Sequence, residues 1–263
     1  MELAINHITA PVEDLEAFFY LAKSAGVGQV EIRCDMPDVV TNYAPSDVKS
    51  AAEKAGVKII TINALYPFNC WSGDLERKAN QLADYALACG VEAIVMCPLN
   101  EGRAVSVADL ILSLKNLKPI LKARQLVGLI EPLGFPRSSL RTKRAAVTAI
   151  EEVDGWDVFR LVHDTFHHHL ADEMELFPGR TGLVHVSGVT DLAIAVDDLS
   201  DDDRVLVDDR DRLGNIAQMR SLIKGGYKGP FSLEAFSPSV HALPEPGEAV
   251  RKCLEYVRHS VTG

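Results

Sequence analysis

The sequence predicts an α/β protein: a single-domain (β/α)8 barrel, or TIM barrel, that spans residues 1–263. Three observations support this prediction. The chain has 263 residues, close to the roughly 250 that are typical of this fold. Short apolar segments alternate with longer amphipathic ones along the whole chain. A helix-like segment that runs through AGV or CGV into an apolar stretch occurs three times, as AGVGQVEI, AGVKIITI and CGVEAIVM.

Eight segments have the composition of buried strands. In chain order they are Leu3–Ile8, Gln29–Arg33, Val57–Ala64, Glu92–Cys97, Val127–Glu131, Phe159–Asp164, Gly182–Ser187 and Phe231–Phe236. Stretches such as IVMC, LVGLIE and GLVHVS are continuously apolar, as is typical of parallel strands that are covered on both faces. The pattern therefore indicates a parallel sheet with helices outside it.

The segments between the strands have helical periodicity. In GDLERKANQLADYALACG and VADLILSLKNLKPILKARQ, apolar residues recur every three or four positions. Glycine stands where several such segments should end, at Gly26, Gly56, Gly90 and Gly226. Serial βα units can form an open doubly wound sheet or a closed barrel, and eight units in a chain of this length favour closure.

Charge and cysteine content disfavour several classes of protein. The net charge of −10 opposes nucleic-acid binding, because phosphate backbones attract clustered Lys and Arg. The cysteines form no CxxC pair, which predicts reduced thiols and a cytoplasmic location. They are Cys34, Cys70, Cys89, Cys97 and Cys253. We expect no signal peptide and no membrane span, since neither a basic-then-apolar start nor a run of about 18 apolar residues occurs.

Four successive predicted strands carry an acidic or imidazole side chain at or near their carboxyl ends. These residues are Glu131, Asp164, His185 and Glu234. Such groups are costly to bury unless they are paired or bind a metal, and active sites of these barrels lie at this end of the strands. Three carboxylates and one imidazole suit a single divalent cation, Mn²⁺, Mg²⁺, Co²⁺ or Zn²⁺.

Further polar residues should surround this predicted metal site. Asn6 and His7 end the first strand, Glu31 and Arg33 end the second, and Asn63 ends the third; all could bind substrate hydroxyls or be ordinary strand-end residues. Among the three consecutive histidines, His167 is the one that we expect to face the pocket.

An acidic segment over residues 191–212 interrupts the regular alternation of strands and helices. Most of its aspartates are expected in a solvated loop. The alternative is a lid or rim over the barrel mouth, since long loops in compact domains are often functional.

Other catalytic signatures are absent from the sequence. It contains no GxSxG, no GxxxxGK[ST] and no HExxH. The glycines of GVGQVE follow a helix and precede a strand, which is the wrong context for a dinucleotide-binding turn.

Several segments together resemble the xylose-isomerase-like barrels, in particular the inosose (2-keto-myo-inositol) isomerases of bacterial inositol catabolism. They are VEIR (30–33), TINALYPFN (61–69), GVEAIVMCPL (90–99), GLIEPLGFP (128–136), LVHDTFHHH (161–169), LVHVSGVTD (183–191), DDDRV (201–205) and SLEAFSP (232–238). The resemblance implies a metal site at Glu131, Asp164, His185 and Glu234. It also implies substrate contacts from His167, and from Arg204 in the DDDRV element.

The sequence departs from these relatives at two places. Asp191 lies where the related ketose 3-epimerases usually carry arginine, and LVDDRDRLGN replaces the Pro-Gly-x-Gly stretch that many relatives have after DRV. The first departure weakens an epimerase interpretation. The second leaves the geometry of that loop, and the roles of Arg204 and Arg210, open.

The resemblance and the expected ligands together imply a mechanism. The cation would bind the ketone and an adjacent hydroxyl and stabilise an enediolate, while Glu131 or Glu234 moves the proton between neighbouring carbons. The alternatives are a ketose 3-epimerase, an endonuclease-IV-like repair enzyme and a non-catalytic sugar-binding module. The expected partner is a small polyol or ketose, and a homo-oligomer is compatible with the family.

Overall fold

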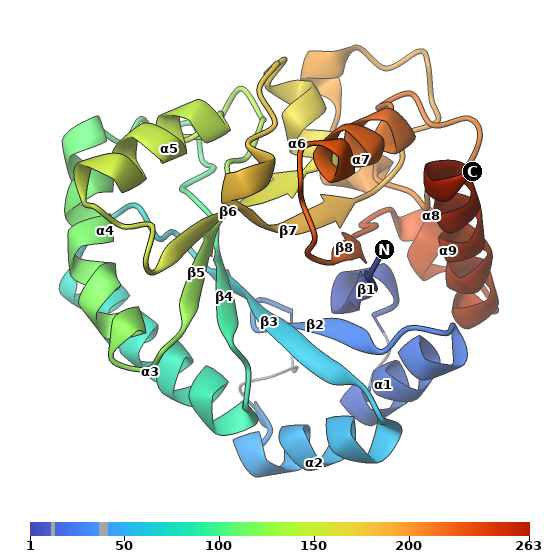
Figure 1. Cartoon of the computed structure of the whole chain (residues 1–263), viewed down its shortest axis with the longest axis horizontal. Coiled ribbons are helices and arrows are strands. Elements are labelled where there is room, and N and C mark those ends of the chain that lie inside the picture. Colours follow the sequence, from blue (N-terminus) through green and yellow to red (C-terminus); the bar gives the residue numbers. More distant parts are fainter. Residues whose placement is uncertain (12–13, 37–41) are drawn as a thin grey trace.

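A computed structural model describes residues 1–11, 14–36 and 42–263. Its strands form a closed barrel in the order β1-β2-β3-β4-β5-β6-β7-β8, and every neighbouring pair is parallel. Figure 1 shows the strands at the centre and the helices around them. The predicted (β/α)8 barrel is confirmed.

The strands lie where the sequence predicts them, with small differences at their ends. They are β1 Leu3–Asn6, β2 Gln29–Arg33, β3 Lys58–Leu65, β4 Ala93–Met96, β5 Val127–Ile130, β6 Phe159–Asp164, β7 Thr181–Val186 and β8 Phe231–Leu233. The first strand is shorter than the predicted Leu3–Ile8. It ends at Asn6 because the side chain of Asn6 accepts a hydrogen bond from the backbone of Ile8 and starts a 3-10 turn.

Two of the predicted strands, Val127–Glu131 and Phe231–Phe236, also end earlier than expected. Glu131 and Glu234 each lie one residue beyond their strand. Their backbone N–H groups still bond to the neighbouring strand, at 3.0 Å to Met96 and 2.9 Å to Val186. The side chains of Glu131 and Glu234 are therefore held at the barrel mouth although both residues lie just beyond their strands.

Helices cover the outside of the barrel. They are α1 Leu15–Ser24, α2 Pro45–Ala55, α3 Gly73–Cys89, α4 Val107–Lys122, α5 Lys143–Glu152, α6 Thr165–Leu170, α7 Asn215–Lys224, α8 Pro238–His241 and α9 Pro246–Thr262. Gly56 and Gly90 end α2 and α3 in left-handed conformation, with φ of 70° and 76°, which residues with a side chain rarely adopt. No helix in the described ranges is long and apolar enough to cross a bilayer.

Two hydrophobic clusters of the described residues form the core of the barrel itself. The larger one fills the space between the strands and the surrounding helices. A smaller cluster, which includes Val95, Leu129, Val162 and Leu183, is formed by strand residues of opposite parity, and these point into the barrel. This apolar layer closes the barrel interior, so the polar residues further along the same strands lie above a packed base.

Helix α6 packs closely against the loop after β5. A Cβ placed on Gly134 would lie 2.2 Å from the backbone oxygen of His167 and 2.8 Å from the side chain of Leu170. Only glycine allows this approach, because both nearest groups belong to the helix and its packed side chain. Gly134 therefore determines how near α6 lies to the barrel mouth.

We predict that Gly134→Ala destabilises the protein by about 1–3 kcal/mol, the usual cost of overpacking. Gly179→Ala is the matched control, since a Cβ there meets nothing within 4 Å. Urea unfolding of both variants measures the difference. Equal midpoints for the two variants would contradict the close approach.

Candidate metal centre

The two-residue alternation of a strand places the predicted ligands inside the barrel. On β6, Val162 belongs to the apolar layer and Asp164 lies one step above it; on β7, Leu183 and His185 are related in the same way. Asp164 and His185 are also register partners on neighbouring strands. The same side of the sheet thus carries both groups at the same height.

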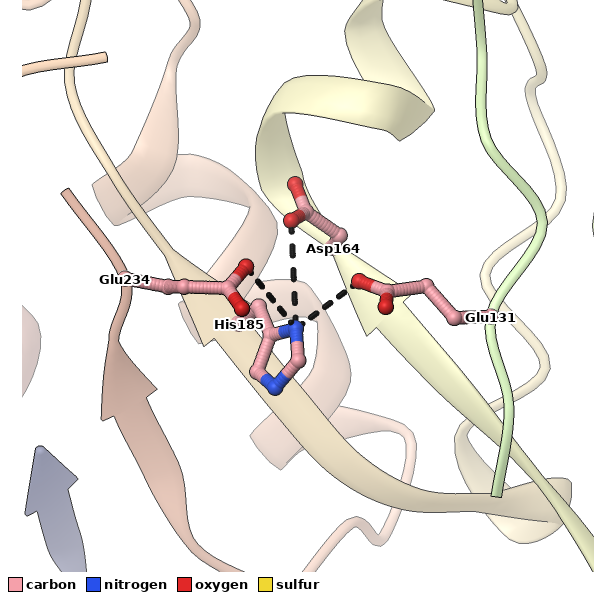
Figure 2. Close-up of side chains that lie close together, drawn as sticks. All are labelled: Glu131, Asp164, His185 and Glu234. Atoms are coloured by element: carbon pink, nitrogen blue, oxygen red, sulfur yellow. Dashed lines mark hydrogen bonds and ion pairs between the residues drawn. The ribbon is translucent and has the colours of Figure 1, made fainter. Parts of the chain in front are cut away.

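The four predicted ligands converge on one point. Glu131, Asp164, His185 and Glu234 are all buried, and one potential ligand atom from each lies within 4.8 Å of the others. Figure 2 shows the three carboxylates directed at the Nδ1 edge of the imidazole. Their nearest oxygens lie 2.8 Å (Glu131), 3.1 Å (Glu234) and 3.9 Å (Asp164) from Nδ1.

The surrounding carboxylates favour the protonated form of the imidazole. Burial by itself would lower the pKa of His185, but the negative charges of Glu234, Glu31 and Glu131 raise that pKa well above its ordinary value. The carboxylates around Nδ1 thus favour a positive charge at this position.

Glu234 is the most heavily hydrogen-bonded carboxylate of the site. Its Oε1 accepts from Asn6 at 3.0 Å, Arg33 at 3.0 Å and Asn63 at 3.4 Å, so three residues that the sequence suggested for substrate contact converge here on one oxygen. Burial would raise the pKa of Glu234, but the positive charges of His185, Arg204 and Arg33 lower it far below its ordinary range.

Arg204 brings a second buried guanidinium into the site. Its Nη2 lies 2.6 Å from Asp164 Oδ2 and 2.9 Å from Glu234 Oε2, and its Nε donates to Ser187 Oγ at 3.0 Å. The guanidinium also lies over the rings of Phe166 and Phe236. The side chain is only about 1 % exposed, so this part of the acidic segment enters the barrel mouth.

The remainder of residues 191–212 is an ordered rim. Short 3-10 turns form at Val196–Asp198 and Asp201–Asp203, and an antiparallel bridge joins Gly188 to Val205. Asp191 is exposed and caps its own turn by accepting from the backbone of Ala193. Position 191 therefore contributes no side chain to the predicted ligands, whereas Arg204 of the same segment contacts two of them.

His167 lies above Asp164 on α6, the helix that Asp164 begins by accepting backbone hydrogen bonds from Phe166 and His167. Its ring meets Phe135 and Phe166 edge to face. The Nδ1 atom has no hydrogen-bond partner among the described residues. Its neighbour His168 instead contacts Lys143 behind the helix, at 2.8 Å.

Cys97, which no sequence motif singled out, is also a member of the site. It follows β4, and its thiol donates to Glu131 Oε2 at 3.3 Å. Burial and the charge of Glu131 raise the pKa of Cys97 well above its ordinary value, so the sulfur stays protonated. Its position directly after a strand is consistent with a place at the barrel mouth, but no cysteine motif in the sequence points to a functional role.

The residues fit a divalent cation in both spacing and charge. Bonds of about 2.0–2.2 Å would place ligands within roughly 4.4 Å of one another, slightly less than the observed spread. The buried carboxylates of Glu31, Glu131, Asp164 and Glu234 face the buried guanidinium groups of Arg33 and Arg204. Among these buried groups alone, two negative charges are left when the imidazole is neutral, and these match one divalent ion; Arg33 also pairs with the partly exposed Asp35.

Comparison with known proteins places the chain in a family. The model of the xylose isomerase-like TIM barrel family matches residues 19–259, and the chain belongs to this family. No curated protein matches the sequence.

Solved structures share the whole architecture. A xylose isomerase domain containing protein from Salmonella typhimurium LT2 is 33 % identical, with a TM-score of 0.92 over 100 % of this chain and 97 % of that one. A structure of IolI protein with a bound zinc atom is 20 % identical (TM-score 0.86; 100 % and 98 % covered). D-psicose 3-epimerase from Clostridium cellulolyticum H10, solved with D-tagatose, is 13 % identical (TM-score 0.76; 99 % of both chains).

We predict that metal uptake releases a proton from His185. The raised pKa of His185 means that the metal-free protein holds this proton at neutral pH, and an imidazole must lose it to become a ligand. Affinity for Mn²⁺ should therefore increase as pH rises toward that pKa. Calorimetric titration at one pH in buffers of different ionisation enthalpy measures the proton, and a binding heat that is the same in every buffer would refute the prediction.

Proposed function

We propose that this protein is a cytoplasmic, divalent-metal-dependent isomerase that moves a proton between neighbouring carbons of a small polyhydroxylated ketone. The preferred substrate is 2-keto-myo-inositol (inosose), which would make the protein an enzyme of inositol catabolism. The observation that carries the proposal is the convergence of Glu131, Asp164, His185 and Glu234 at the barrel mouth.

The ligand atoms follow from the contacts of each side chain. Oδ2 of Asp164 and Oε2 of Glu234 are the oxygens that face His185 Nδ1, and both also accept from Arg204. The other oxygens face away from that position: Asp164 Oδ1 accepts from the backbone of α6, and Glu234 Oε1 accepts from Asn6, Arg33 and Asn63. Glu131 Oε1 and His185 Nδ1 complete the set. A divalent cation held there would act as a Lewis acid and stabilise the negative charge of the enediolate.

Glu131 is the better candidate for the base. Each oxygen of Glu234 already accepts from at least one charged donor, and its lowered pKa makes it a weak proton acceptor. Glu131 Oε2 accepts only the weak thiol donor Cys97 among the described residues. We therefore assign proton transfer to Oε2 of Glu131 and a metal-anchoring role to Glu234.

One available base favours isomerisation over 3-epimerisation. An isomerase can use a single carboxylate to take a proton from one carbon and return it to the next on the same face. Epimerisation inverts one carbon, so the proton must leave from one face and return on the other, which calls for two groups. Glu234 already accepts hydrogen bonds at both oxygens, so it is a poor second base, which supports isomerisation.

The balance of charges supports an uncharged substrate. With one divalent cation, the buried carboxylates and guanidinium groups of the site cancel, so a phosphate or carboxylate on the substrate would add an unpaired charge to a buried site. The imidazole of His167, on α6 just after Asp164, is the group that we expect to contact a substrate hydroxyl. A polyol ketone suits both features.

We predict that Glu131→Gln lowers the turnover of inosose at saturating Mn²⁺ at least about 10²-fold, the usual contribution of a general base. Glu234→Gln should instead weaken metal binding and retain more turnover once metal is saturating. Glu152→Gln, on the exposed face of α5, is the control. Wild-type turnover by metal-saturated Glu131→Gln would remove Glu131 from the base role.

We predict that the purified, Mn²⁺-loaded protein moves the carbonyl of 2-keto-myo-inositol to the adjacent carbon. Proton NMR of the product in D₂O reports which carbon acquires deuterium. D-Fructose and D-tagatose are the comparison substrates, since inversion at C3 identifies a 3-epimerase. Faster inversion of either ketose than isomerisation of inosose would replace this proposal by the epimerase alternative.

A further inference from the structure

Glu31 is a buried carboxylate that none of the roles above uses. It lies on β2 with no exposed surface and shares its register with Asn6 on β1 and Thr61 on β3. Its side chain therefore points into the barrel among the site residues. A carboxylate in such a place is costly unless it has specific partners.

The main partner of Glu31 is the edge of His185 that faces away from the other carboxylates. The Nε2 atom of the imidazole lies 3.1 Å from Oε1 and 3.2 Å from Oε2 of Glu31. Thr61 donates its hydroxyl to Oε2 at 2.6 Å and so fixes the carboxylate from behind. Glu31 is not one of the residues that converge on a shared ligand position.

His185 therefore lies between two different environments. Its Nδ1 faces Glu131, Glu234 and Asp164, and its Nε2 faces Glu31. A ring nitrogen that holds a proton cannot bind a metal, so the position of the remaining proton decides which edge becomes the ligand. A carboxylate that accepts from Nε2–H keeps the proton there and leaves the lone pair of Nδ1 toward the carboxylates.

We infer that Glu31 is a positioning residue: it holds His185 in the Nε2-protonated form, so that Nδ1 is the metal ligand. This inference rests on the metal site of the proposed function. The carboxylate also strengthens the imidazole as a donor and restricts rotation of the ring, the two effects by which such partners raise metal affinity. Glu31 thus acts through His185 and does not meet the substrate.

The test uses Co²⁺, which binds such sites and shifts the proton resonances of its ligands. In the Co²⁺-loaded protein, ¹⁵N-histidine labelling should identify one exchangeable, strongly shifted N–H proton, on Nε2 of His185. Because the group is fully buried, this proton should exchange slowly with water. The affinity for Co²⁺ is measured by calorimetry on the same samples.

Glu31→Gln should weaken Co²⁺ binding about 10- to 100-fold, the usual effect of losing such a partner, and speed exchange of the shifted proton. Glu31→Asp keeps the charge and should recover part of the affinity. Glu152→Gln, far from the site, should match the wild type. Circular dichroism verifies that each variant is folded, and the Asp variant keeps the test valid should the Gln variant fail to fold.

The possible results separate this inference from the proposed function. Unchanged affinity and exchange in Glu31→Gln, an Asp variant that binds no better than Gln, or a shifted proton on Nδ1 would each overturn the role of Glu31. If the wild-type protein binds Co²⁺ through Nδ1 but leaves inosose unchanged, the proposed substrate is wrong and the positioning role of Glu31 still stands. Wild-type protein that binds no Co²⁺ would overturn both.

Discussion

The structure of the barrel mouth depends on how the negative charge of its buried carboxylates is balanced. Glu31, Glu131, Asp164 and Glu234 all lie within the reach of one imidazole, where a bare carboxylate would be strongly destabilising. Two guanidinium groups offset part of this charge. A proton on His185 offsets one of the two remaining negative charges, and a divalent cation would offset both.

The source of one of these guanidinium groups connects the site to the rest of the chain. Arg204 belongs to an acidic segment whose composition is typical of a solvated loop, yet its side chain is as buried as the core. Its backbone oxygen also accepts from Phe236 and Ser237, just beyond β8. Arg204 thus connects the rim to the end of β8 and to the candidate ligand Glu234. The segment after β7 therefore forms part of the candidate metal centre.

The two glutamates of the predicted site differ because their surroundings differ. Glu234 is surrounded by donors from β1, β2 and β3, whereas Glu131 meets a thiol and the imidazole. The first arrangement favours a permanent anion and the second leaves an oxygen able to accept a proton.

The sequence by itself determined the fold and the four residues that were expected to converge as a metal site. Eight apolar runs with helices between them leave few other arrangements, and parallel strands bring their carboxyl ends to one rim, so Glu131, Asp164, His185 and Glu234 could be predicted to meet. Tertiary structure decided the rest. Glu31, Cys97 and the donors to Glu234 come from strands that are distant in sequence, and no local pattern states which side chain faces which oxygen. Strand alternation gives the side of the sheet on which a residue lies, but hydrogen-bond partners depend on barrel closure and on side-chain rotamers, which follow from packing of the whole chain.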